Sequence, residues 1–256
     1  TPASTDMKLF IRALGREAES RAAALSAGRG GETDTLYFGG GTPSMLSDTH
    51  LGRLMETLDR LVPVDKLDEF SFEANPATFT EKKVRFWRSL GMTRVSLGVQ
   101  SLDSGILRLL GREHTPDQAL RSVEMLKNAG MPHINMDLMF AIPGQPLSIW
   151  EATLKEAVRA GTDHISAYNL TYEEDTEFFR SLLRGEKRQD PDEDAAYFEL
   201  AEHMLEAAGM RHYETSNYAR EGCRSPHNMA YWKGEDYVGI GPGAVSTING
   251  IRYSNT

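Results

Sequence analysis

Short strand-like runs alternate with helix-like segments along most of the sequence, and this alternation constrains the fold more than any other feature. Five runs bounded by turn residues have the composition of strands, at residues 35–38, 69–73, 94–99, 133–140 and 164–169. The segments between these runs have the apolar periodicity of helices. The order β-α-β-α predicts an α/β fold, with parallel strands in a sheet or barrel and helices on the outside.

Helix signals support the same order. Ser47 and Asp48 are candidate N-caps for a helix whose apolar stripe is Leu51, Leu54, Leu58 and Leu61. Further helices are expected at residues 7–27, 80–90, 116–129, 146–160 and 192–208. A glycine follows each of the last four helices, and glycine is favoured there because the residue after a helix often takes the left-handed conformation. These glycines are Gly91, Gly130, Gly161 and Gly209.

Composition excludes several classes of protein. The 28 basic and 37 acidic residues give a formal charge of −9, which argues against a surface that binds nucleic acid. No apolar run reaches the roughly 18 residues of a membrane-spanning helix, and no signal peptide is visible. Cys223 is the single cysteine, which fits the cytoplasm and excludes a zinc or iron–sulfur site built from several cysteines of these residues.

Polar or glycine-rich elements stand at or near the ends of four expected strands. They are the run from Gly39 to Pro43, and then Glu73, Gln100 and Asp137. The strand ends of a parallel barrel converge on one rim, where ligand sites are built, and Arg112 lies close enough in sequence to reach it. Carboxylates hold hydroxyl or ammonium groups and a guanidinium holds a carboxylate, so the set suits a zwitterionic amino acid that carries a ribose.

The ordered motifs resemble the radical S-adenosylmethionine proteins of the coproporphyrinogen dehydrogenase (HemN)-like group. The motifs that carry this resemblance are GGGTPS (39–44), EANP (73–76), SLGVQS (96–101), GREH (111–114) and NMDLMFAIPGQ (135–145). The tail is similar to the HemW branch of haem chaperones, whose mark is HNxxYW. It reads YETSNYAR (213–220), HNMAYW (227–232) and DYVGIGPGAVS (236–246).

The resemblance implies an incomplete (β/α) TIM-like barrel of the radical S-adenosylmethionine type that lacks its first strand. It implies that Gly40, Gly41 and Thr42 bind the methionyl amino end of S-adenosylmethionine. It also implies that four residues hold the ligand's carboxylate and ribose, namely Glu73, Gln100, Arg112 and Asp137. His227 matches the proposed haem-contacting position. Haem or another porphyrin and haem-accepting proteins are therefore the expected partners.

The family also holds a 4Fe–4S cluster on a CxxxCxxC loop, and these residues contain no such loop. The chain begins without Met and ends abruptly, which favours a segment of a longer protein. We expect an N-terminal helix and glycine-rich joint at 1–30, a partial barrel at 31–172, and a barrel-completing helical segment with the HNxxYW region at 173–256, without the C-terminal domain that usually follows.

Three functions remain open at this point. The first is a haem chaperone that binds haem and S-adenosylmethionine and delivers haem to haem proteins. The second is oxygen-independent coproporphyrinogen III dehydrogenase, and the third is a cluster-free module that binds S-adenosylmethionine. Purely structural roles are alternatives to ligand binding at two places. The glycine run could be a tight turn, and His227 could be a packed, hydrogen-bonded residue. We interpret His114, His133 and His164 as structural, and Cys223 as an inert or surface thiol.

Overall fold

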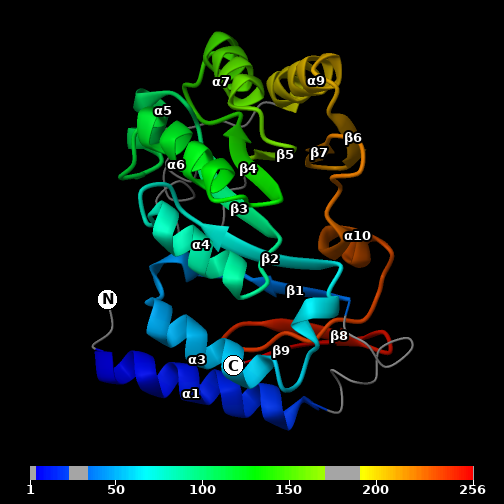
Figure 1. Cartoon of the computed structure of the whole chain (residues 1–256). Coiled ribbons are helices and arrows are strands. Elements are labelled where there is room, and N and C mark those ends of the chain that lie inside the picture. The colour runs from blue at the N-terminus through cyan, green and yellow to red at the C-terminus, as the bar shows by residue number, and fades with distance from the viewer. Residues whose placement is uncertain (1–3, 23–33, 171–190, 256) are drawn as a thin grey trace, which may run out of the picture. The chain divides into compact units, whose positions relative to one another are not determined.

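The computed structural model describes residues 4–22, 34–170 and 191–255 (Figure 1). It divides into two compact units. Unit 1 comprises residues 1–73, 81–94 and 225–256, and unit 2 comprises residues 74–80 and 95–224. Each unit is described below by itself. The glycine-rich joint expected at 28–31 lies outside the described residues, and the division at 1–30, 31–172 and 173–256 stays a prediction.

Seven of the described strands form one sheet in the order β1-β2-β3-β4-β5-β7-β6. Their bounds are β1 Thr35–Phe38, β2 Glu69–Ala74, β3 Arg94–Gln100, β4 His133–Phe140, β5 His164–Asn169, β6 Arg211–Glu214 and β7 Asn217–Ala219. β1 pairs parallel with β2, and β4 pairs parallel with β5, whereas β7 runs antiparallel to both β5 and β6. Helices alternate with β1 to β5 along the chain, which confirms the incomplete (β/α) barrel.

Unit 1 contains α1 (Ser4–Ser20), α3 (Asp48–Leu58), α4 (Glu81–Ser89), α10 (Pro226–Trp232) and the hairpin of β8 (Val245–Ile248) and β9 (Ile251–Ser254). α1 lies beside α3, and α10 lies beside β1 (Figure 1). Ser47 caps α3, because its hydroxyl accepts the backbone N–H of His50 at 3.2 Å. Phe70, Phe72 and Trp87 are fully buried and make the core that β2 and α4 share.

Unit 2 contains α5 (Ser104–Leu109), α6 (Pro116–Asn128), α7 (Leu147–Ala160) and α9 (Pro191–Ala207), and α7 packs beside α9 (Figure 1). Thr115 and Gln118 form a reciprocal capping box at the start of α6, which places Pro116 at the first helical position. Gly161 ends α7 with φ of 67°, a conformation that costs glycine little. Leu97, Met136 and Trp150 are fully buried in this unit.

The expected helices and strands are present with ends that differ by a few residues. The exception is the first helix, because α1 ends at Ser20 and the rest of its expected range, 23–27, lies outside the described residues. Four short strands were not expected, namely β6, β7, β8 and β9. Among the described residues, no helix has both the length and the apolar composition that crossing a bilayer would require.

Candidate functional site

The glycine run after β1 and the carboxylate at the end of β2 meet in unit 1. The backbone N–H of Gly40 donates to Oε2 of Glu73 at 3.1 Å, and the Tyr37 hydroxyl donates to Oε1 of the same carboxylate. A Cβ at Gly39 would lie 2.3 Å from Cε1 of Tyr37 and 2.7 Å from Oε1 of Glu73, so only glycine fits there. The side chain of Tyr37 thus buttresses the loop that the sequence motif identified.

The next two glycines present open backbone. Gly40 has φ of 73° and Gly41 has φ of 67°, and a Cβ at either position would meet no described atom within 4 Å. Their backbone groups are therefore accessible to a ligand. Thr42 follows directly, and its carbonyl accepts the N–H of Met45 at 3.0 Å in the short helix η1 (Pro43–Met45).

His227 lies in the first turn of α10, and its ring is held from two sides within unit 1. Nδ1 lies 2.8 Å from the hydroxyl of Thr35 in β1. The ring stacks on Tyr37 with a centroid separation of 4.9 Å and an interplanar angle of 10°. Tyr231, one turn further along α10, meets the same imidazole edge-on at 5.2 Å. Among the described residues, no hydrogen bond reaches Nε2.

Burial lowers the pKa of His227 below its ordinary value of 6.5, and the nearby carboxylate of Glu69 opposes this shift. The side chain is therefore neutral at pH 7. When Nδ1–H donates to the Thr35 hydroxyl, the lone pair of Nε2 remains for a metal, which is the form in which histidine binds iron.

A buried ion pair anchors the start of α10. Arg94 Nε donates to Oε2 of Glu69 at 2.6 Å, and both side chains are almost wholly buried. Oε1 of Glu69 accepts the hydroxyls of Ser71 at 2.9 Å and Ser225 at 2.8 Å. Ser225 is also the N-cap of α10, because it accepts the N–H of Asn228 at 3.1 Å. The ion pair thereby fixes the helix that carries His227.

In unit 2, Gln100 ends β3 in a sparsely populated backbone conformation. Its φ is 66°, and the N–H of Ser101 donates to the carbonyl of Val99 at 2.8 Å, which closes a tight three-residue turn. Nε2 of His114 lies 3.1 Å from the same carbonyl. Strain of this kind persists only where the surroundings hold it, and it gathers at functional sites. His114 has the structural role expected, since it supports the turn of Gln100.

Neighbouring polar side chains bond the carboxylate of Asp137 in unit 2. The hydroxyl of Ser96 donates to Oδ2 at 2.8 Å, and the amide of Asn135 donates to Oδ1 at 2.6 Å. Arg112 lies close enough for Asp137 to raise its pKa, although burial has the larger effect and lowers it. Burial, followed by the charge of Asp137, raises the pKa of Tyr168 to about 12, so the phenol stays protonated.

Asn135 extends this polar cluster along β4 and β5. Its Oδ1 lies 2.6 Å from Nδ1 of His164, and Nε2 of His164 lies 2.8 Å from the hydroxyl of Tyr213. His164 is therefore a structural residue in the described geometry, as expected. The network orients the carboxylate of Asp137, because its donors Ser96 and Asn135 are also bonded to each other, at 2.7 Å.

The structure brings the predicted residues together in two groups. Unit 1 joins Gly40 to Glu73, and unit 2 places Arg112 in the field of Asp137. The full set of eight site residues stays a prediction. Sequence reasoning missed the residues that hold them: Thr35, Tyr37, Glu69, Ser96, Asn135 and Ser225. Only Asn135 carried a signal, since it lies two residues before Asp137 on the same face of β4.

Comparison with known proteins identifies the family. The sequence profile of the radical SAM superfamily matches residues 15–157, which is more than half of the chain. The chain belongs to the radical SAM superfamily. Its fold resembles that of coproporphyrinogen III oxidase (HemN) from Escherichia coli, with a TM-score of 0.79 and 22% identity over 96% of this chain and 59% of that one.

Curated relatives confirm the resemblance to the HemN/HemW-like group. "Heme chaperone HemW" of Lactococcus lactis subsp. lactis (strain IL1403) is 37% identical over 86% of this chain. The protein of the same name from Mycobacterium tuberculosis (strain ATCC 25618 / H37Rv) is 38% identical over 96% of this chain. The radical SAM chain described here spans 59% and 63% of the length of these two relatives, respectively.

The donor groups of this radical SAM chain suit one of the two cofactors that its superfamily implies. Open backbone at Gly40 and Gly41 and the carboxylate of Glu73 in unit 1, and separately the carboxylate of Asp137 and the guanidinium of Arg112 in unit 2, are groups of the kind that bind the charges and hydroxyls of S-adenosylmethionine. The 4Fe–4S cluster does not fit these residues, because Cys223 supplies one thiolate where three are needed.

Proposed function

We propose that this chain belongs to a haem chaperone, which binds haem and passes it to haem proteins. The observation that carries the proposal is the environment of His227. The imidazole is neutral at pH 7, held at Nδ1 by Thr35 and stacked on Tyr37, within the motif HNMAYW. The two HemW relatives carry the name of a haem chaperone, which supports the same conclusion.

Haem is cargo in this proposal, and His227 is the side chain that binds its iron. Nε2 supplies the lone pair, while Thr35 accepts the proton of Nδ1 and fixes the ring. Tyr231 and Trp232 of α10 are 48% and 58% exposed, so their rings are accessible to a porphyrin face. His227 would hold the haem iron through a single bond, which a ligand from an acceptor protein could replace.

S-adenosylmethionine has a supporting or regulatory role in this proposal. Gly40, Gly41 and Thr42 would bind its methionyl amino end, and the carboxylate and ribose would be held by Glu73, Gln100, Arg112 and Asp137. When bound beside a cluster, this cofactor supplies radical chemistry in the superfamily. The residues of this chain bind and orient it. The lone cysteine fits a reducing compartment, and the proposal places the protein in the cytoplasm.

Coproporphyrinogen III dehydrogenation is less well supported. The likeness to HemN at 22% identity shows the fold alone. The third possibility is a cluster-free module that binds S-adenosylmethionine, and a thermal melt distinguishes it from a haem chaperone. If the chain is such a module, S-adenosylmethionine raises its melting temperature and haem does not.

Haem titration tests the proposal. Ferric haem is added to the wild-type chain, to His227→Ala, and to His50→Ala as a matched control. His50 is half-buried and bonds the Ser47 hydroxyl at 3.0 Å, far from α10 in sequence. We expect the wild type and His50→Ala to bind alike, and His227→Ala to bind at least about tenfold more weakly. Equal affinity of all three chains would remove His227 from the proposal.

A further inference from the structure

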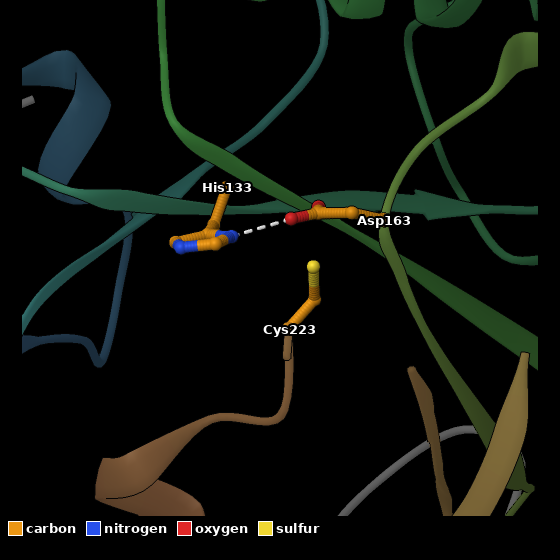
Figure 2. Close-up of side chains that lie close together, drawn as sticks. All are labelled: His133, Asp163 and Cys223. Atoms are coloured by element: carbon orange, nitrogen blue, oxygen red, sulfur yellow. Dashed lines mark hydrogen bonds and ion pairs between the residues drawn. The ribbon is translucent and has the colours of Figure 1, made fainter. Parts of the chain in front are cut away.

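Three side chains outside the predicted site residues place metal-binding atoms close together in unit 2. His133 is the first residue of β4, Asp163 directly precedes β5, and Cys223 follows β7. Figure 2 shows the three side chains converging from these separate segments. One donor atom from each of them, a histidine nitrogen, a carboxylate oxygen and the sulfur, lies within 4.8 Å of the other two.

Backbone hydrogen bonds hold the three segments in this arrangement. The N–H of Ile134 donates to Oδ1 of Asp163 at 2.7 Å, which orients the carboxylate. The N–H of Arg220 donates to the carbonyl of Asp163 at 2.9 Å, and the N–H of Cys223 donates to the carbonyl of Arg220 at 3.0 Å. Strand pairing fixes the backbone at His133 and Asp163, and a turn fixes the backbone at Cys223. The three side chains therefore converge.

The distances suit a small divalent cation. Nδ1 of His133 and Oδ2 of Asp163 are 2.5 Å apart and form a hydrogen bond. Ligands on a tetrahedral zinc ion are about 3.4 Å apart for nitrogen and oxygen, and about 3.6 Å apart when one is sulfur. Replacing the hydrogen of this bond by a metal would thus require movements of roughly 1 Å. All three side chains retain some exposure to solvent, so an ion can enter.

The donor set selects the class of metal. Thiolate and imidazole ligands favour borderline transition metals such as Zn²⁺ over Mg²⁺ or Ca²⁺, which prefer all-oxygen sites. Oδ1 of Asp163 already accepts the Ile134 N–H, and such a second contact typically orients a ligating carboxylate.

The cluster lies at the amino ends of β4 and β5. Asp137 and the other polar residues of the predicted cofactor site lie further along the strands, toward their carboxyl ends. In barrels of this kind the carboxyl ends carry the chemistry, and the amino ends serve stability.

We propose that unit 2 binds one Zn²⁺ through Nδ1 of His133, Oδ2 of Asp163 and the thiolate of Cys223, with a water molecule as the fourth ligand. Zn²⁺ takes the place of the hydrogen between Nδ1 of His133 and Oδ2 of Asp163, the neutral imidazole keeps its one proton on Nε2, and the thiol gives up its proton to solvent. The metal cross-links β4, the start of β5 and the segment that follows β7. The site uses none of the residues that are proposed to bind haem or S-adenosylmethionine.

Metal titration tests this proposal on the reduced chain after treatment with a chelator. Zinc chloride is titrated by calorimetry, and cobalt chloride is titrated by absorption, because a cobalt–thiolate bond gives a charge-transfer band in the near ultraviolet. We expect one equivalent of each metal to bind and the cobalt complex to show this band. Removing one ligand, as in Cys223→Ser or Asp163→Asn, should weaken zinc binding by at least about tenfold to 100-fold.

Two controls make the test decisive. Asp163→Asn keeps an oxygen that can accept the Ile134 N–H, so its fold is retained while the anionic ligand is lost. His50→Gln removes a half-buried imidazole of unit 1 and should bind zinc as the wild type does. Binding that survives in Cys223→Ser, a cobalt complex without the thiolate band, or no one-to-one binding at all would each overturn the proposal. None of these results bears on haem binding.

Discussion

Thr35→Val tests whether the hydroxyl of β1 prepares His227 for iron. The substitution keeps the size and β-branching of the side chain, so the pairing of Thr35 with Glu69 across β1 and β2 should persist. It removes the hydrogen bond, at 2.8 Å, that holds Nδ1 within the described part of the chain.

The expected magnitude follows from that one bond. A neutral, partly buried hydrogen bond contributes about 0.5–1.5 kcal/mol. This range corresponds to a loss of haem affinity of about two- to tenfold. Thr35→Ser keeps the hydroxyl and should bind haem as the wild type does. Thr57→Val in α3 is the matched control, because the Thr57 hydroxyl bonds the Arg53 carbonyl of its own helix at 3.5 Å.

The assay is absorption of the ferric haem complex during titration, with a thermal melt of each chain to confirm folding. Thr35→Val should bind more weakly than both Thr35→Ser and Thr57→Val. If Thr35→Val binds haem as tightly as Thr35→Ser, the hydroxyl does not orient the imidazole and the reasoning is refuted.

Three more predictions concern the same unit. Glu69→Gln leaves the buried charge of Arg94 without its carboxylate, so the free energy of unfolding in urea should fall by about 3–5 kcal/mol; an unchanged midpoint would contradict this. The folded-state pKa of His227 lies below 6.5, so as the pH falls through 6.5 the unfolded chain takes up a proton that the folded chain does not. Urea unfolding at about pH 7.5 and about pH 5.5 should therefore show a larger loss of stability in the wild type than in His227→Gln, and equal losses would argue against the shift. Tyr37→Ala should weaken haem binding by about two- to tenfold through the lost ring stack, whereas Tyr37→Phe should not, and titration of both variants separates ring from hydroxyl.

Local patterns in the sequence were sufficient to predict the main elements. The residues of β4 and β5 carry the alternation and the bounding turns of strands, and β4 begins and ends where predicted. Because burying a carboxylate among apolar residues is costly, the sequence also predicted that Asp137 has a partner or ligand, and the structure shows protein partners. Ser96 and Asn135 supply the hydrogen bonds, and Arg112 supplies a positive charge nearby.

The C-terminal hairpin was missed although it carries a local signal. Asn249 and Gly250 connect β8 to β9, and both have positive φ, of 51° and 75°. Asn-Gly between two strand-like runs is typical of a tight hairpin turn. Strands of four residues are too short to show a clear alternation, and the glycine-rich surroundings concealed them.

The residues that hold the site could not be read from spacing. Thr35 and Tyr37 meet His227 across 190 or more positions of sequence, and Glu69 meets Ser225 across 156. Such contacts depend on which strands and helices pack together, and no periodicity within one segment encodes that. The same reason explains why the sequence alone indicates a structural role for His133 and an inert or surface thiol at Cys223, whereas the structure places both beside Asp163.

Chemical rescue of His227→Gly tests the central claim most directly. The absorption spectrum of ferric haem is recorded with the variant alone and with added imidazole, which can occupy the space that the ring leaves. If Nε2 of His227 is the iron ligand, the variant loses the spectrum of the wild-type complex and imidazole restores it. A variant that gives the wild-type spectrum without imidazole would contradict the assignment of His227 as the haem ligand.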